Sequence, residues 1–263
     1  MTQIDKAGAT YWDDNWTNID FPKSFDHTDK CLDNFVNLEL HKYFQRFLGN
    51  RKDFSVLEIG CANSIWPIYF YQYFDAQVYG LDYSEVGCEK SRAILKHYNI
   101  PGEVYCADLF TPPSELVGNF DLVVSFGVVE HFEDTANCLK SCAAFVKPGG
   151  TLLTLIPNMP SIIGFIQKYV DRAIYDVHVP LTKKMFKKAH QKAGVSLEDC
   201  DYFMSINLSV VNSGTFSSNF FNKYLRHLLS ASSKICWILE KYGIKIPKNR
   251  ITSPYIMAVA KVK

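Results

Sequence analysis

Small and acidic residues follow three apolar runs of the chain, each at the point where the run ends. The first run, 55–59, contains Glu58 and leads directly into the small-residue turn Gly-Cys-Ala-Asn-Ser at 60–64. Two later runs are followed by Asp82 and Asp108. A turn of small residues lets a ligand approach the backbone closely, and a carboxylate after a neighbouring strand can accept both hydroxyls of a ribose. These residues in this order indicate a site for a nucleotide-like cofactor, although a glycine turn alone is also typical of ordinary chain punctuation.

The pair Glu130 and His131 follows a fourth apolar run, 120–126, on its carboxyl side. Ligands of open α/β sheets bind outside the carboxyl ends of the strands, and histidine is the side chain that titrates nearest neutral pH. His131 is therefore the best candidate for a general base, and Glu130 beside it is the second catalytic candidate. The alternative interpretation is a structural histidine that caps or packs at the loop.

Two further clusters combine aromatic rings with carboxylates or histidine and are candidate substrate contacts. They are Tyr11, Trp12, Asp13 and Trp16 near the N-terminus, and Tyr175, Asp176 and His178 after the fifth apolar run. Ring faces and carboxylates together can cage a cation. The alternatives are that the N-terminal aromatics only fasten that segment to the core, and that His178 is a packing residue.

The elements that must position these residues can be read from hydrophobic periodicity. Seven short apolar runs bounded by turn residues predict strands at 55–59, 76–81, 103–107, 120–126, 151–156, 202–211 and 255–262. Stretches with helical spacing precede and separate the first five, such as 32–48 and 84–97. Strands that are apolar on both faces require helices on both sides of the sheet. We therefore predict an α/β fold with a seven-stranded, mostly parallel, doubly wound Rossmann-like sheet whose last two strands pair antiparallel.

The same pattern divides the chain into four parts. Residues 1–50 are predicted to form an N-terminal lid and helix, and residues 51–212 the cofactor-binding core. A second stretch with helical spacing, within 213–248, interrupts the core as a helical lid insertion, and residues 249–263 return as its last strand.

Composition excludes several classes of protein. The 263 residues carry 28 Lys plus Arg and 27 Asp plus Glu, so the formal charge is only +1, which argues against a nucleic-acid partner. Neither a secretory leader nor an apolar stretch long enough to span a membrane is evident, so we expect a cytoplasmic protein. The eight cysteines are scattered without a Cys-x-x-Cys pair, so we expect neither a metal site nor disulfides.

The four motifs, together with Lys147-Pro-Gly-Gly150 before the fifth strand, resemble the class I S-adenosylmethionine-dependent methyltransferases. The resemblance is to the small-molecule branch that includes ubiquinone-pathway and sugar methyltransferases, and it covers residues 50–200. It implies S-adenosylmethionine as cofactor and S-adenosylhomocysteine as product. The chain departs from the three-glycine loop of that family, because Ala62 and Ser64 occupy the second and third glycine positions.

The resemblance also assigns roles to individual residues of the cofactor site. It implies that the methionine part lies beside Glu58, Gly60 and Ala62, the ribose at Asp82 and Tyr83, the adenine at Asp108 and Leu109, and the sulfonium near Phe126.

The expected activity is methyl transfer to a small metabolite. The carboxylates and rings of the two clusters favour nitrogen in an amine or guanidine as the acceptor, since such a group can attack without a base. The main alternative is a hydroxyl acceptor with His131 as its base. More distant alternatives are an NAD-dependent dehydrogenase, whose Gly-x-Gly-x-x-Gly spacing is absent after Gly60, and a non-catalytic cofactor-binding module. The sequence does not predict an oligomeric state.

Overall fold

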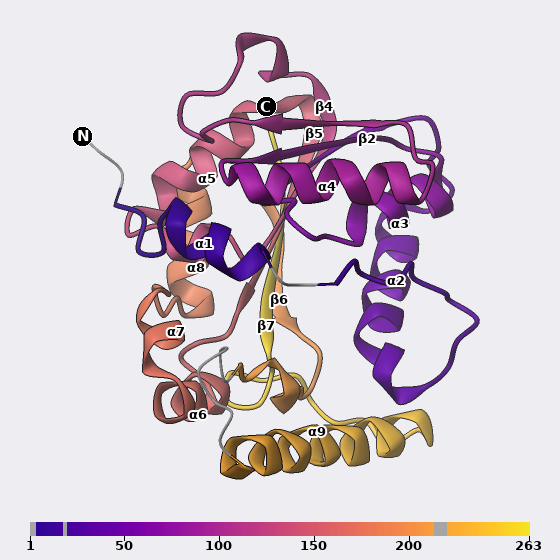
Figure 1. Ribbon diagram of the computed structural model, residues 1–263, viewed down its shortest axis with the longest axis vertical. Helices are drawn as coiled ribbons and strands as arrows, with labels where there is room; N and C mark the ends of the chain where they lie inside the picture. The colour runs from indigo at the N-terminus through magenta and orange to yellow at the C-terminus, as the bar shows by residue number, and fades with distance from the viewer. Residues whose placement is uncertain (1–3, 18–19, 213–219) are drawn as a thin grey trace.

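A seven-stranded sheet forms the centre of the structure, a computed structural model that describes residues 4–17, 20–212 and 220–263 (Figure 1). The strand order is β3-β2-β1-β4-β5-β7-β6. The strands are β1 (Ser55–Ile59), β2 (Gln77–Asp82), β3 (Gly102–Cys106), β4 (Phe120–Phe126), β5 (Val146–Pro157), β6 (Ser196–Phe203) and β7 (Tyr255–Lys261). Neighbours among the first five are parallel, and β7 pairs antiparallel with both β5 and β6. The predicted mostly parallel, seven-stranded class is confirmed.

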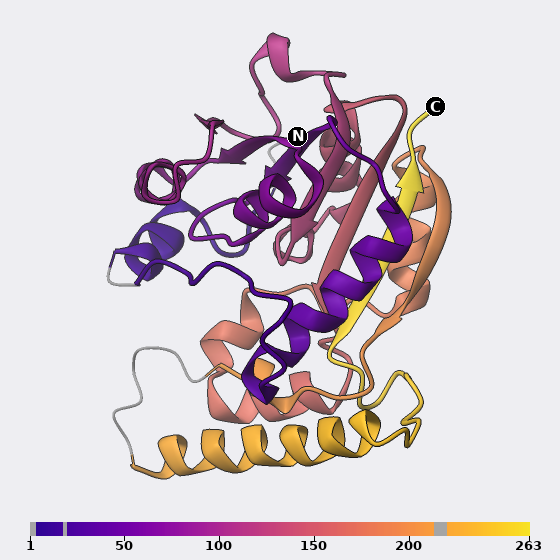
Figure 2. The same ribbon diagram turned by 90° about the vertical axis from the view of Figure 1, so that its right-hand side faces the viewer.

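Helices cover both faces of the sheet (Figures 1 and 2). One hydrophobic core joins the sheet to α2 (Phe35–Leu48), α3 (Trp66–Phe74) and α4 (Glu85–His97), and the other joins it to α5 (Thr135–Ala144) and α8 (Lys183–Lys192). Successive residues of β1 alternate between the two cores, since Val56 belongs to the first and Leu57 to the second. This is why the strand reads as a continuous apolar run rather than as an alternating pattern.

Strand boundaries agree with the sequence to within one residue except at the fifth and sixth strands. The fifth strand, predicted at 151–156, begins at Val146, so β5 includes the Lys147–Gly150 motif that was placed before it. The prediction of a strand at 202–211 is wrong, because β6 ends at Phe203 and the chain turns at Met204, whose φ is +62°. Asn207 then begins a short 3-10 helix, η4 (Leu208–Val210), by accepting the backbone N–H of Ser209. The observed β6 is an edge strand with several acidic residues on its exposed face, so it lacks the apolar run that identifies the inner strands.

The N-terminal segment forms a helix, α1 (Ala9–Trp16), that lies against α4. The hydroxyl of Ser84, which caps the first turn of α4, donates a hydrogen bond of 2.5 Å to Asp13. Lys90 reaches from α4 to the backbone carbonyl of Trp16 at 3.1 Å. These contacts hold α1 at the end of β2.

The insertion between β6 and β7 contains one long helix, α9 (Phe220–Lys241), which lies across one end of the molecule (Figures 1 and 2). Two shorter helices, α6 (Ile162–Val170) and α7 (Arg172–Asp176), follow β5. Residues 1–3 and 18–19 of the predicted lid and 213–219 of the predicted insertion lie outside the described residues. No helix in the described part of the chain is long and apolar enough to cross a membrane.

Candidate active site

A cavity of about 240 Å³ lies at the carboxyl ends of β1, β2 and β4. This is the position at which open α/β sheets bind their ligands, because the strand order reverses direction there. Most residues that the resemblance assigns to the cofactor line this cavity: Glu58, Gly60, Ala62, Asp82, Tyr83, Leu109 and Phe126.

The turn after β1 brings the backbone close to the cavity. Gly60 has a φ of +75°, and a Cβ atom built on it would lie 2.4 Å from Cγ2 of Val128. Both the backbone conformation and the close approach therefore require glycine at this position. At the third glycine position, the hydroxyl of Ser64 donates a 2.8 Å hydrogen bond to Glu58 and accepts the backbone N–H of Trp66.

The side chain of Glu58 is buried, and one of its two carboxyl oxygens lacks a hydrogen-bond donor in the described structure. Its Oε1 accepts the hydrogen bond from Ser64, whereas its Oε2 has no partner in the described structure. Burial raises the pKa of Glu58 to about 8. An ammonium group in the cavity would satisfy the free oxygen and favour the ionised form, so the residues present fit the amino group of the cofactor's methionine part.

Asp82, at the end of β2, presents its carboxylate to the cavity. Its two carboxylate oxygens accept the backbone N–H groups of Ala62 at 3.2 Å and Ser84 at 2.9 Å. Burial raises the pKa of Asp82 above its usual range. Each oxygen retains a second lone pair, so the side chain can also accept two hydroxyls from a ligand in the cavity that it lines.

After β3, only one of the two residues predicted to contact the adenine, Leu109, reaches the cavity. Leu109 is buried and lines the cavity, whereas Asp108 is exposed and is not among the lining residues. The carboxylate of Asp108 instead accepts the backbone N–H of Phe110 at 2.9 Å. The role of Asp108 at the adenine remains a prediction that this geometry does not support.

Aromatic rings form the rest of the cavity wall. Trp12 and Trp16 of α1 line it and stack with ring centroids 5.7 Å apart, and Trp66 and Phe126 line it with centroids 5.2 Å apart. From the sequence alone, a core role for Trp66 is favoured over a place in the cavity wall, because a tryptophan beside a helix start is more often a core residue. Its position directly after the small-residue turn at 60–64 was the available signal.

The other N-terminal candidates do not line the cavity. Tyr11 is half-buried beside it, and Asp13 is engaged with the cap of α4. Asp5, which the sequence analysis missed, does line the cavity, and it accepts a 2.6 Å hydrogen bond from the hydroxyl of Tyr83. An isolated β-bridge between Asp5 and Phe132 places it there, and no sequence pattern marks such a bridge.

His131 also lines the cavity and belongs to the 3-10 helix η3 (Val129–His131). Its Nδ1 is 2.8 Å from the carbonyl of Val177, so Nδ1 carries the proton and Nε2 keeps its lone pair. The edge of its ring meets Trp12 at a centroid distance of 5.2 Å. Burial lowers the pKa of His131, which favours the neutral form that can accept a proton.

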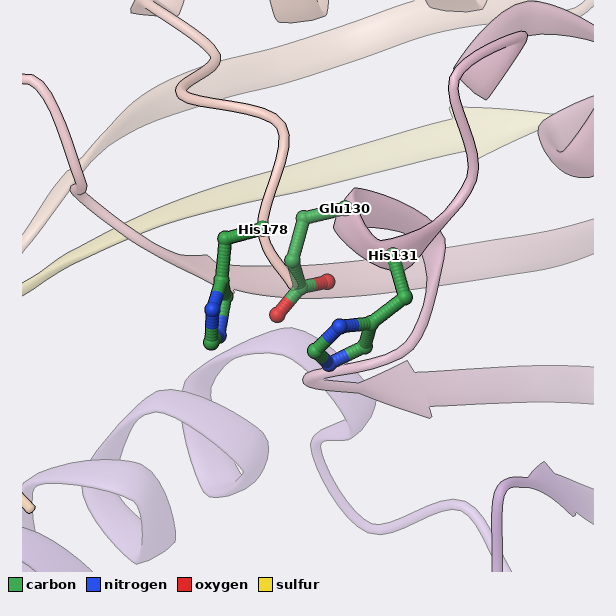
Figure 3. A group of neighbouring side chains, drawn as sticks. All are labelled: Glu130, His131 and His178. Carbon is green, nitrogen blue, oxygen red and sulfur yellow. The ribbon is translucent and has the colours of Figure 1, made fainter. Parts of the chain in front are cut away.

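Glu130 and His178 lie beside His131, as Figure 3 shows. Glu130 is buried, its carboxylate oxygens have no partner among the described residues, and burial raises its pKa to about 8. The rings of His131 and His178 are 4.6 Å apart, and burial lowers the pKa of His178 to about 4. One ligand atom from each of the three residues lies within 4.8 Å of the others, a donor set that could hold a divalent metal ion.

The structure does not bring Tyr175 and Asp176 to the cavity. Both are on α7, where Asp176 forms an exposed ion pair with Arg172 at 3.2 Å and Tyr175 lies 5.6 Å from the ammonium group of Lys168. They were predicted to contact the substrate because they follow the fifth strand in the sequence. The intervening α6 instead carries them away along the surface.

Comparison with known proteins agrees with this geometry. A family model described as a methyltransferase domain matches residues 32–246. The demethylmenaquinone methyltransferase of Bacillus mycoides (strain KBAB4) is 30% identical over 184 residues, which cover 65% of this chain and 74% of that protein. The corresponding Bacillus cereus (strain ATCC 10987 / NRS 248) protein is 28% identical over the same shares of the two chains.

Solved structures show the same fold at low identity. A putative sarcosine dimethylglycine methyltransferase from Galdieria sulphuraria is 12% identical with a TM-score of 0.62, covering 96% of this chain and 97% of that chain. Geranyl diphosphate C-methyltransferase from Streptomyces coelicolor A3(2), solved with S-adenosyl-L-homocysteine, is 11% identical with a TM-score of 0.60, covering 96% of each chain. Because the family model matches residues 32–246, the chain belongs to the methyltransferase-domain family, as a class I enzyme that uses S-adenosylmethionine and acts on small molecules.

Proposed function

We propose that the enzyme methylates a largely apolar, ring-bearing small molecule at an oxygen or carbon atom that must lose a proton. The observation that carries this proposal is the wall of the cavity beyond the cofactor residues, where Trp12, Trp16, Trp66 and Phe126 line the cavity and Trp12 packs against the ring of His131. A flat apolar acceptor would lie against Trp12 and Trp66, with its reacting group toward Nε2 of His131. The demethylmenaquinone methyltransferases, similar over most of their length, are named for an acceptor of this kind.

The main task of the protein in this reaction is to position the cofactor and the acceptor relative to each other. S-adenosylmethionine, held by the residues around Glu58 and Asp82, would supply the methyl group, whose bond to sulfur would break as the bond to the acceptor forms, leaving a neutral thioether. His131 takes the acceptor's proton on Nε2, while the Nδ1 contact with Val177 keeps the ring oriented. Phe126 and the tryptophans exclude water and hold the reactants in line, which supplies most of the rate enhancement in such displacements.

A nitrogen acceptor is the second candidate, and one observation favours it. The ring faces of Trp12 and Trp16 at the cavity suit a cationic group. The carboxylates that first favoured nitrogen are not available, since Asp176 is on the surface and Glu130 does not line the cavity. We therefore rank the proton-losing acceptor first.

Defined acceptors separate the two candidates. With methyl-labelled S-adenosylmethionine, we expect label on a reduced naphthoquinone bearing a short prenyl chain, and none on primary or secondary amines of similar size. Trp12→Leu should raise the Michaelis constant for the quinol about tenfold, because it removes an aromatic contact of the order of 1.5 kcal/mol. The matched control is Tyr11→Leu, on the same helix but outside the cavity. Label on amines alone would reject the proposal in favour of nitrogen.

Cofactor affinity is expected to increase with pH up to about 8. The pKa of Glu58 is raised to about 8 in the free protein, and a bound ammonium group would lower it, so binding should release a proton below that pH. The dissociation constant of S-adenosylhomocysteine should then fall up to ~tenfold per pH unit between pH 6 and about 8. Calorimetric titration in two buffers of different ionisation heat measures the released proton. In Glu58→Gln we expect weaker binding without this pH dependence, and a flat profile in the unaltered protein would contradict the assignment.

A further inference from the structure

Helix α9 is attached to the rest of the protein by one of its faces. The indole of Trp237 stacks on Phe35 with centroids 4.9 Å apart, and its Nε1 donates to the carbonyl of Ile206 at 2.8 Å. One turn earlier, the hydroxyl of Ser233 accepts the backbone N–H of Leu208, also at 2.8 Å. These contacts fix α9 against η4 and the start of α2.

The opposite face of α9 is also apolar, and it is exposed. Large side chains between 39% and 83% exposed recur every three, four or seven residues, the spacing of a stripe along one side of a helix. The outward stripe comprises Tyr224, Leu228, Ile235, Ile238, Leu239 and Tyr242. A soluble helix normally presents polar residues on this side, so a stripe of this length marks a surface that is covered by something else.

The segment that contains α9 is rich in basic residues. Residues 220–250 contain seven Lys or Arg and a single acidic residue, Glu240, whereas the whole chain has a net charge of only +1. Lys234 is paired with Asp33 at 2.6 Å. Arg226 and Lys241 are exposed on the side of α9 that also carries Trp237, and Lys245, beyond the end of the helix, is exposed as well. The segment that carries the exposed apolar face is therefore strongly basic.

The position of α9 relates this surface to the cavity. β6 runs antiparallel to β7, as β5 does, so β6 ends and β7 begins at the edge of the sheet where β1, β2 and β4 also end. The connection that contains α9 thus starts and ends at the edge of the sheet that holds the cavity. The helix itself lies across one end of the molecule (Figures 1 and 2).

We propose that α9 docks on the surface of an anionic phospholipid bilayer, with the outward stripe at the boundary of headgroups and acyl chains. An amphipathic helix binds in this way when apolar burial and attraction of basic residues to anionic lipid act together. A second copy of the chain fits less well, because pairing two such faces would bring two strongly basic segments together. Docking does not depend on which acceptor is methylated, and it would bring the cavity edge toward lipid-dissolved molecules.

Vesicle sedimentation tests the proposal. At about 0.1 M salt, vesicles with about 30% phosphatidylglycerol should bind the full chain at least ~tenfold more tightly than pure phosphatidylcholine vesicles, and higher salt should weaken that binding. The double variant Leu228→Ser/Ile235→Ser should lose at least ~tenfold in affinity for the anionic vesicles. Val117→Ser, which alters an exposed apolar residue far from α9 in sequence, is the matched control and should bind as the unaltered chain does.

The readout is independent of methyl transfer. Titration with S-adenosylhomocysteine should give the same dissociation constant for the double variant and the control, which shows that both are folded. Failure of the unaltered chain to bind anionic vesicles, or equal binding by the folded double variant, would overturn the proposal. A concentration-dependent dimer that the double variant abolishes would also overturn it, since the stripe would then be an interface between two copies.

Discussion

Asp82→Ala is expected to raise the dissociation constant of S-adenosylhomocysteine at least ~tenfold. The carboxylate lines the cavity and would accept two ribose hydroxyls in charge-assisted hydrogen bonds, each contributing ~1.5–3 kcal/mol when buried. Calorimetric titration measures the loss.

Two further variants separate a ligand contact from a structural role. Asp82 also accepts the backbone N–H groups of Ala62 and Ser84, so Asp82→Asn, which keeps one acceptor oxygen, tests whether the loop survives without the charge. Asp108→Ala is the matched control, because that carboxylate is exposed and outside the cavity. An Asp82→Ala protein that keeps its circular dichroism spectrum and its affinity would reject the ribose assignment.

His131→Ala is expected to lower turnover ~10²-fold, while the affinities for cofactor and acceptor change little. The reason is that Nε2 of His131 is the proton acceptor offered by the aromatic side of the cavity, given that the carboxylate of Asp5 already binds Tyr83. Initial rates with a labelled methyl donor, at saturating acceptor, measure the change.

His131→Asn distinguishes a base from a positioning residue. The asparagine amide can still donate to the carbonyl of Val177, but it cannot accept a proton at neutral pH. We expect Asn to be as slow as Ala. Turnover restored by Asn would show that the contact with Val177 matters rather than proton transfer, and full turnover in the Ala variant would move the acceptor assignment to nitrogen.

Sequence reasoning succeeded where the signal was local. The inner strands are apolar on both faces, so their runs are visible, and residues that directly follow such runs must lie at the carboxyl edge of the sheet. Gly60 and Asp82 were found for this reason, Glu58 was found because it is the next-to-last residue of its run, and all three line the cavity. The turn conformation at Gly60 is also encoded locally, since few other residues adopt its positive φ.

Contacts between remote segments could not be predicted in the same way. Asp5 reaches the cavity through an isolated bridge to Phe132, and the cluster of Glu130 and His178 depends on how α6 and α7 return the chain to η3. Asp176 was predicted to contact the substrate because it follows the fifth strand in the sequence, but α6 and α7 place it on the surface, where it pairs with Arg172. No metal site was predicted, because that expectation was based on the spacing of the cysteines. Cysteine spacing cannot reveal a set of possible metal ligands that comes from separate loops, such as Glu130, His131 and His178.

The most direct test of the central claim is the chemical nature of the labelled product. The enzyme is incubated with methyl-labelled S-adenosylmethionine and a total extract of cellular metabolites, and the products are divided between an organic and an aqueous phase. We predict an enzyme-dependent label in the organic phase, on a ring-bearing neutral compound, that is lost in His131→Ala. Label only on cationic amines in the aqueous phase, at equal rates in both proteins, would contradict the proposed acceptor and the role of His131.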